Sequence, residues 1–107
     1  MPDVSVEDLA AVHSRGAAQV IDVREPAEYV AGHVPGAASV PMTQLPGRLG
    51  ELDRSRPVFV ICQSGGRSTA MTDVLLHRGF DAHSVAGGTI AWARAGRPID
   101  TGAPKGK

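Results

Sequence analysis

Apolar residues in this chain gather in short runs that alternate with segments of helical spacing. The runs at 19–23, 58–61 and 82–85 predict strands, and briefer runs at 4–6 and 38–40 predict two more. The run at 58–61 contains no polar residue, which is typical of a strand buried on both faces of a parallel sheet. It is therefore predicted to be the central strand.

The segments between the strands carry start and stop signals of helices. The predicted helices span residues 7–13, 26–31, 66–78 and 89–95, with a loose helix across 43–52. Ser5 is a candidate N-cap for the first of them, and Gly16 follows its end. Strands alternating with helices along the whole chain predict an α/β fold with a parallel sheet, right-handed crossovers and helices on both faces.

The length of 107 residues fits one domain, since typical domains run to about 100–150 residues. No internal repeat and no linker divides the sequence, so residues 1–100 are predicted to form a single domain. Residues 101–107 contain glycine, proline and lysine but no large apolar residue. They are predicted to be a disordered C-terminal tail.

Charge and cysteine content exclude several classes of function. Eleven basic and eleven acidic residues cancel, so no global field favours nucleic acid or a membrane surface. One cysteine allows neither an internal disulfide nor a cysteine-based metal cluster, and the four histidines show no ligand spacing. We expect no metal and no cofactor. The absence of a signal peptide or a long apolar run, and an unpaired thiol, favour a cytoplasmic protein.

The candidate chemistry follows the central strand. The strand at 58–61 runs into Cys62, the only cysteine, and so delivers it to the carboxyl edge of the sheet, where open α/β folds place their ligands. Gly65 and Gly66 permit a tight loop whose N–H groups point inward, and the helix that follows adds the positive end of its dipole. Arg67 adds a cation suited to an oxyanion. Together these features favour a reactive thiolate over a buried structural thiol.

Two charged residues near the end of an earlier strand are candidates for a supporting role. Asp22 lies at the carboxyl end of the strand at 19–23, on the same edge as Cys62. We expect it to orient the loop or Arg67. Arg24 is within reach of the same pocket, although pairing with Glu28, four residues on, is the favoured expectation.

Three stretches resemble the signatures of the rhodanese (sulfurtransferase) family, specifically a free-standing single rhodanese domain. They are Ile21 to Tyr29 leading to Gly32 to Ala37, then Cys62 to Ser68, and then Val85 to Trp92 with Gly96 to Pro98. The resemblance covers roughly residues 4–99. It implies a three-layer fold in which a central five-stranded parallel sheet carries helices on both faces.

The resemblance also implies an activity. Cys62 would take a sulfane sulfur from a donor such as thiosulfate, hold it as a persulfide, and pass it to cyanide or a thiol, with a sulfur-relay protein as a further partner. The implied substrate-binding residues are Gln63, Ser64, Gly65, Gly66, Arg67 and Ser68. Many family members carry a basic residue where this chain has Gln63. We therefore expect a raised KM for thiosulfate rather than lost chemistry.

Three alternatives stay open from the sequence. A phosphatase would use a Cys and an Arg on a similar loop, but those loops place five residues between them and this chain has four. A persulfide carrier or regulatory binding module would load Cys62 with little turnover. A redox sensor would oxidise the same thiol, although the chain contains no second cysteine to resolve it.

Overall fold

Five short strands form one parallel sheet. The computed structural model describes residues 3–16 and 19–103. Within these residues the strands are β1 (Asp3–Val4), β2 (Gln19–Asp22), β3 (Ala38–Ser39), β4 (Val58–Ile61) and β5 (Ala82–Val85). They pair in the order β1-β5-β4-β2-β3, with every pairing parallel. The strand β4 lies at the centre, as its apolar sequence predicts.

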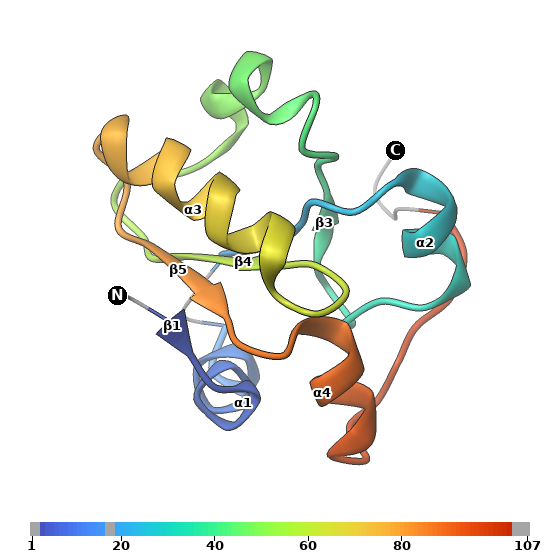
Figure 1. Cartoon of the computed structure of the whole chain (residues 1–107). Coiled ribbons are helices and arrows are strands. Elements are labelled where there is room, and N and C mark those ends of the chain that lie inside the picture. Colours follow the sequence, from blue (N-terminus) through green and yellow to red (C-terminus); the bar gives the residue numbers. More distant parts are fainter. Residues whose placement is uncertain (1–2, 17–18, 104–107) are drawn as a thin grey trace.

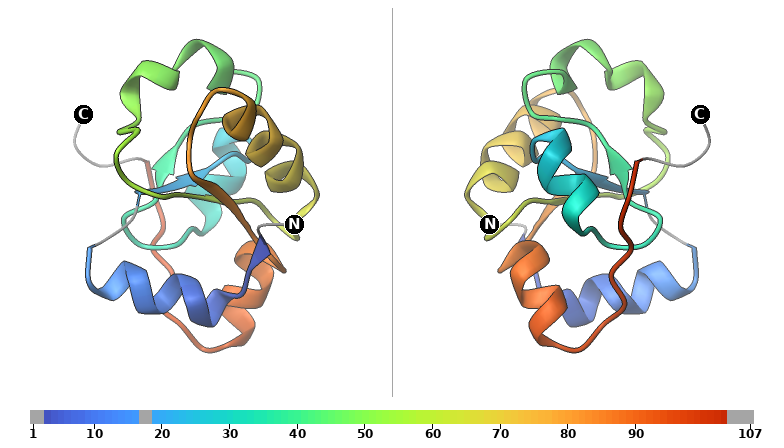
Figure 2. Two further views of the ribbon diagram at one scale, coloured as in Figure 1. Left: turned by 90° about the vertical axis from the view of Figure 1, so that its left-hand side faces the viewer. Right: turned by 90° about the vertical axis from the view of Figure 1, so that its right-hand side faces the viewer.

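Helices cover both faces of the sheet. They are α1 (Val6–Ser14), α2 (Pro26–Ala31), α3 (Gly66–His77) and α4 (Gly88–Arg94), and two 3-10 turns, η1 (Leu45–Gly47) and η2 (Leu49–Glu51), follow β3. Figure 1 shows α3 and the segment with the 3-10 turns on one face, and α1 and α4 on the other. Figure 2 shows the same separation from two further sides. The predicted α/β fold, a parallel five-stranded sheet with helices on both faces, is confirmed.

The alternation of side chains along β4 divides the core into two parts. All four residues of the strand are buried. Val58 and Val60 belong to the cluster beneath α3, whereas Phe59 and Ile61 belong to the cluster beneath α1 and α4. Successive side chains of a strand point to opposite faces, so a strand covered on both sides needs apolar residues at every position.

The first helix begins as its sequence predicts. The Ser5 hydroxyl accepts from the Asp8 amide at 3.0 Å, and the Asp8 carboxylate accepts from the Ser5 amide at 3.2 Å. This reciprocal capping box satisfies two backbone donors that a helix start leaves open. It also confines β1 to Asp3–Val4, so the strand predicted at 4–6 is displaced and shortened. The bounds of the four α-helices otherwise agree with the prediction to within one residue.

The predicted loose helix at 43–52 is wrong. The structure has η1 and η2 there, each of three residues. Pro46 lies within η1 and lacks the N–H that a continuing helix would need. The apolar spacing nevertheless identifies residues that face the core. Leu45 is fully buried, and Leu49 and Leu52 pack against the core under α3.

The segment predicted to be a disordered tail forms a backbone hydrogen bond near its start. The amide of Gly102 donates to the carbonyl of Val30 at 2.9 Å, and the neighbouring Asp100 exchanges two backbone hydrogen bonds with His33, each 2.9 Å long. A backbone carbonyl of α2 therefore holds Gly102, and disorder of the tail stays a prediction. Residues 104–107 lie outside the described residues. Among the described residues, no helix is long and apolar enough to cross a membrane.

Candidate active site

The chain's cysteine continues the alternation of the central strand. Cys62 follows Ile61 directly, and its side chain joins Val58 and Val60 in the core cluster under α3. Only 1% of the residue is exposed. The sulfur thus lies at the carboxyl edge of β4, enclosed by the loop that leads into α3 rather than open to solvent.

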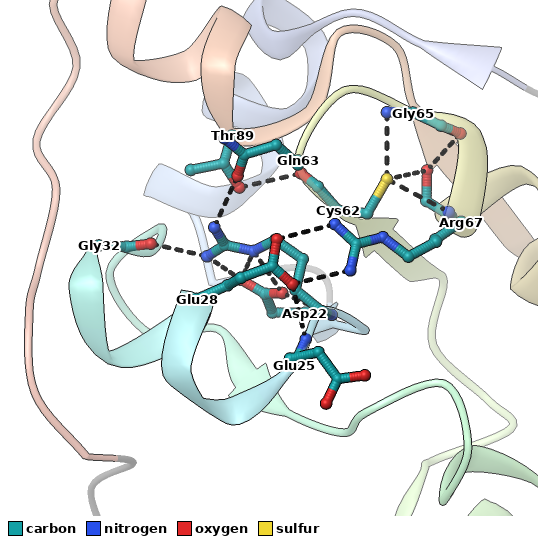
Figure 3. Close-up of polar contacts among 11 residues, drawn as sticks. Asp22, Glu25, Glu28, Gly32, Cys62, Gln63, Gly65, Arg67 and Thr89 are labelled. Atoms are coloured by element: carbon teal, nitrogen blue, oxygen red, sulfur yellow. Dashed lines mark hydrogen bonds and ion pairs between the residues drawn. The ribbon is translucent and has the colours of Figure 1, made fainter.

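Backbone amides of that loop and of the first turn of α3 point at the sulfur. The Gly65 amide donates to Cys62 Sγ at 3.0 Å (Figure 3), and the Ser68 amide donates to it at 3.4 Å. The Ser68 hydroxyl oxygen lies 3.6 Å from the same sulfur. Several backbone N–H groups directed at one atom form a site suited to an anion. The inward-pointing loop that the glycines predicted is present.

These contacts favour the charged form of the thiol. Burial by itself raises the pKa of Cys62, but hydrogen bonds from the Ser68 hydroxyl and from the Ser68, Gly65 and Ser64 amides outweigh it, so the pKa is lowered overall. A hydrogen bond to a charged group is worth about 1.5–3 kcal/mol and one pKa unit corresponds to about 1.4 kcal/mol. Two or three such bonds are therefore enough to offset the cost of burial.

Only one of the two loop glycines has a conformation that requires glycine. Gly65 precedes α3 with φ of +121°, a value that residues with a side chain rarely adopt. Gly66 is the first residue of the helix, has no positive φ, and a Cβ there would meet nothing within 4 Å. The tight turn expected from both residues is made by Gly65 alone.

The start of α4 holds the loop from the other side. The carbonyl of Cys62 accepts from the Thr89 amide at 2.8 Å and from the Thr89 hydroxyl at 3.0 Å, and the carbonyl of Gln63 accepts from the Ile90 amide at 3.1 Å. A Cβ on Gly88 would lie 2.4 Å from the carbonyl oxygen of Cys62, so the approach depends on glycine. Gly88 and Thr89 are site residues that the sequence alone did not identify. The glycine pair at 87–88 was the available signal.

Arg67 is engaged by a carboxylate rather than free for an anion. Its two terminal nitrogens donate to the two carboxylate oxygens of Glu28 at 2.7 and 3.0 Å (Figure 3). About one third of each side chain is exposed. The hydrogen bond from Arg67 is the main cause that lowers the pKa of Glu28 to about 2. Glu28 also accepts from the Glu25 amide at the start of α2, so the start of α3 is tied to the start of α2.

The expected pair of Arg24 with Glu28 is wrong. Arg24 precedes α2, so the helical i,i+4 geometry does not apply, and it turns inward to Asp22 instead. Its Nε and Nη2 donate to the Asp22 carboxylate at 2.7 to 3.1 Å, and both residues are buried. Arg24 Nη1 donates to the Gln63 side-chain oxygen at 3.0 Å. Asp22 therefore contacts the loop through Arg24, not directly.

A groove of about 360 Å³ lies beside the loop. Its polar end is formed by Arg24, Glu28 and Gln63, and the remainder is lined mainly by small and aliphatic side chains. A larger groove of about 500 Å³ lies along β3, away from the cysteine loop. Within the described residues, no group of three or more His, Cys, Asp or Glu side chains is arranged to hold a metal ion. What the arrangement offers chemically is one activated sulfur.

Comparison with known proteins identifies relatives of this chain. The sequence model of the rhodanese-like domain matches residues 5–95. A sulfurtransferase of Allochromatium vinosum is 40% identical over 81 residues, covering 75% of this chain and 76% of the relative. The crystal structure of a rhodanese-related protein from Thermoplasma volcanium has a TM-score of 0.87 and 30% identity, covering 94% of this chain and 98% of the other. The crystal structure of a thiosulfate sulfurtransferase from Pseudomonas aeruginosa has a TM-score of 0.88 and 32% identity. The match covers 97% of this chain and 21% of that longer chain.

The two loop glycines provide a matched pair of variants. Gly65→Ala forces a side chain into a strained conformation at a cost of about 1–3 kcal/mol, and we expect slower alkylation of Cys62 and a lower melting temperature. Gly66→Ala replaces a glycine at a position with room for a Cβ, and we expect an unchanged alkylation rate and a stability gain of up to about 1 kcal/mol. Iodoacetamide kinetics and thermal unfolding measure both effects. Equal alkylation rates and melting temperatures of the two variants would contradict the conclusion that only Gly65 requires glycine.

Proposed function

Because this chain belongs to the rhodanese-like family of sulfurtransferases, we propose that it moves a sulfane sulfur from a donor such as thiosulfate to cyanide or a thiol through a persulfide on Cys62. The observation that carries the proposal is the pair of loop amides on Cys62 Sγ, at 3.0 and 3.4 Å. The same family and the named sulfurtransferase relative support the class of reaction.

In the first half of the proposed reaction, the Cys62 thiolate attacks the outer sulfur of thiosulfate. The sulfur–sulfur bond of the donor breaks, and sulfite leaves with the electron pair. The product is a persulfide anion on Cys62, so charge is conserved without a proton transfer. Sulfite is a stable anion and needs no general acid to leave.

In the second half, the carbon of cyanide or the sulfur of a thiolate attacks the terminal sulfur of the persulfide. The bond between Cys62 and the transferred sulfur breaks, and the electron pair returns to Cys62 Sγ. The amides that favour the first thiolate then favour the regenerated one, since they are fixed by the loop and need no rearrangement. Two separate half-reactions predict ping-pong kinetics.

Residues around the loop hold its backbone and side chains in place. The Thr89 and Ile90 amides fix the carbonyls of Cys62 and Gln63, so the loop amides remain free to face the sulfur. Arg24 donates a hydrogen bond to the Gln63 side chain and forms an ion pair with Asp22, so it links the two residues. We assign donor binding to the loop residues 63–68, and the expectation that neutral Gln63 raises the KM for thiosulfate stays a prediction.

A phosphatase gains no support from this geometry. The four residues between Cys62 and Arg67 make a smaller loop than the five of those enzymes. Arg67 also donates to Glu28 through both terminal nitrogens, so its binding of any anion, thiosulfate included, requires it to leave Glu28.

Cys62→Ser tests the nucleophile. A serine hydroxyl is not ionised at neutral pH and cannot carry the persulfide, so we expect turnover of thiosulfate to fall to background with the fold intact by circular dichroism. Mass spectrometry of the wild type after thiosulfate treatment should show one added sulfur atom on Cys62. Full activity of the variant would remove Cys62 from the mechanism. A loaded wild type without transfer to cyanide or small thiols would favour the carrier role.

The pH dependence of kcat/KM for thiosulfate should show a single limb. The reactive thiolate is lost as the pH falls through the pKa of Cys62, which lies below its ordinary value. Glu28, with a pKa of about 2, stays ionised throughout this limb, and the pKa of Arg67 is raised, so their ion pair persists. In ping-pong kinetics this ratio is independent of the acceptor, so acceptor titration does not enter. A midpoint at or above that of a free cysteine would contradict the prediction.

Glu28→Gln tests whether the ion pair restrains Arg67. The variant keeps a side-chain oxygen for the start of α2 but removes the charge that holds Arg67. We expect the KM for thiosulfate to fall about two- to fivefold, as suits a partly exposed ion pair worth about 0.5–1 kcal/mol, with kcat little changed. Glu51→Gln is the matched control, because it removes the same charge from the surface pair with Arg48. An unchanged or higher KM in Glu28→Gln would show that Arg67 does not bind the donor.

A further inference from the structure

A second buried serine lies behind the loop. Ser84 is on β5, beside β4, and its Cα is in register with that of Val60. Ala82, two residues earlier on the strand, belongs to the same core cluster as Cys62, so side-chain alternation directs Ser84 to the Cys62 face. Only 1% of Ser84 is exposed. A hydroxyl at a buried strand position is costly without a partner, so its contacts are informative.

The partner of Ser84 is a residue that touches the sulfur. Its Oγ lies 2.7 Å from Ser68 Oγ, and Ser68 itself is fully buried. The Ser68 hydroxyl lies 3.6 Å from Cys62 Sγ and 3.0 Å from the carbonyl oxygen of Gly65. The Ser84 hydroxyl is also 3.5 Å from Thr69 Oγ1, a much longer contact. Three groups, Ser84, Ser68 and Cys62, therefore form a chain that ends at the sulfur.

Counting protons shows what this chain does. Ser68 has one hydroxyl proton and three acceptors within reach: Gly65, Ser84 and the sulfur. The Gly65 carbonyl, to which the Ser68 hydroxyl donates at 3.0 Å, also accepts from the Thr69 amide at 3.1 Å and from the Thr69 hydroxyl at 2.8 Å. Three donors exceed its two lone pairs, so the Ser68 proton has a weak hold there. If Ser84 donates its own proton to Ser68, it is no longer an acceptor for Ser68. The ionised sulfur is then the strongest acceptor left.

We infer that Ser84 is a positioning residue for the sulfur chemistry, because its hydroxyl donates to Ser68 and so turns the Ser68 proton toward Cys62 Sγ. This inference rests on the proposed function, since it assigns a residue to the same thiolate. Donation along a chain of hydroxyls also polarises the terminal donor, which strengthens its bond to the anion. The charged groups around the loop, Arg67 with Glu28 and Arg24 with Asp22, are paired and leave this task to neutral donors.

The test is the pH dependence of Cys62 alkylation by iodoacetamide, which reads a single thiol because the chain has one cysteine. Ser84→Ala should raise the apparent pKa of Cys62 by about half a unit, which lowers the thiolate fraction about threefold below that pKa. Ser68→Ala should raise it further. In the Ser68→Ala background, Ser84→Ala should add nothing, because its effect passes through the missing hydroxyl. Equal shifts in both backgrounds, or no shift in Ser84→Ala, would overturn the inference.

Isosteric variants separate the hydroxyl from packing. Ser84→Thr and Ser84→Val introduce side chains of the same branched shape, with a methyl group in Val where Thr has the hydroxyl, so the Thr variant should keep a lower pKa of Cys62 than the Val variant. Identical titrations of the two would overturn the inference, even if Ser84→Ala is too unstable to measure. Thr72→Val is the matched control, because the buried Thr72 hydroxyl on α3 has no hydrogen-bond partner among residues 3–16 and 19–103, and it should leave the titration unchanged.

Alkylation measures the thiol and not sulfur transfer. A failed thiosulfate assay would therefore count against the proposed function, while a failed titration would count against Ser84 alone.

Discussion

The hydrogen bonds from the Gly65 and Ser68 amides to Cys62 Sγ are the contacts on which the site depends. They direct the partial positive charge of two N–H groups at a sulfur that is almost completely buried, where solvent cannot stabilise an anion. Everything nearby keeps those amides in place. Strand β4 fixes the sulfur, Gly65 turns the loop, and the amides at the start of α4 hold the loop carbonyls away from the sulfur.

The two arginines near Cys62 contact protein groups, so in this structure they stabilise the loop and its surroundings rather than bind a substrate anion. Arg24 is buried against Asp22 and contacts the Gln63 side chain, while Arg67 is bound to Glu28 on α2. The Arg24–Gln63 hydrogen bond connects the segment after β2 to the loop after the neighbouring strand β4, and the Arg67–Glu28 pair connects the start of α3 to α2. The thiolate is consequently favoured by neutral donors at short range. Attraction of an anionic donor would instead depend on how readily Arg67 exchanges one carboxylate for another anion.

Much of this architecture can be predicted from short stretches of the sequence. The apolar run at 58–61 predicted the central strand, the alternation of elements predicted the parallel sheet, and Ser5 was the predicted N-cap of α1. The order of strand, cysteine, glycine and arginine also predicted a loop that points amides at the sulfur. These features depend on neighbours within a few residues, so a single sequence is enough to identify them. The helix at 43–52 failed because Pro46 overrides the apolar spacing.

The pairing of charges and hydroxyls was decided only by the tertiary structure. Sequence spacing favoured Arg24 with Glu28, but the fold gives Arg24 to Asp22 and brings Glu28 to Arg67, 39 residues away. Ser84 reaches Ser68 across the face between β5 and α3, and Gly88 reaches the Cys62 carbonyl because α4 packs beside the loop. The sequence determines which elements form and where the sulfur lies. Which donor meets which acceptor depends on how elements far apart in the chain pack together. A pattern that spans a few neighbouring residues does not specify those long-range contacts.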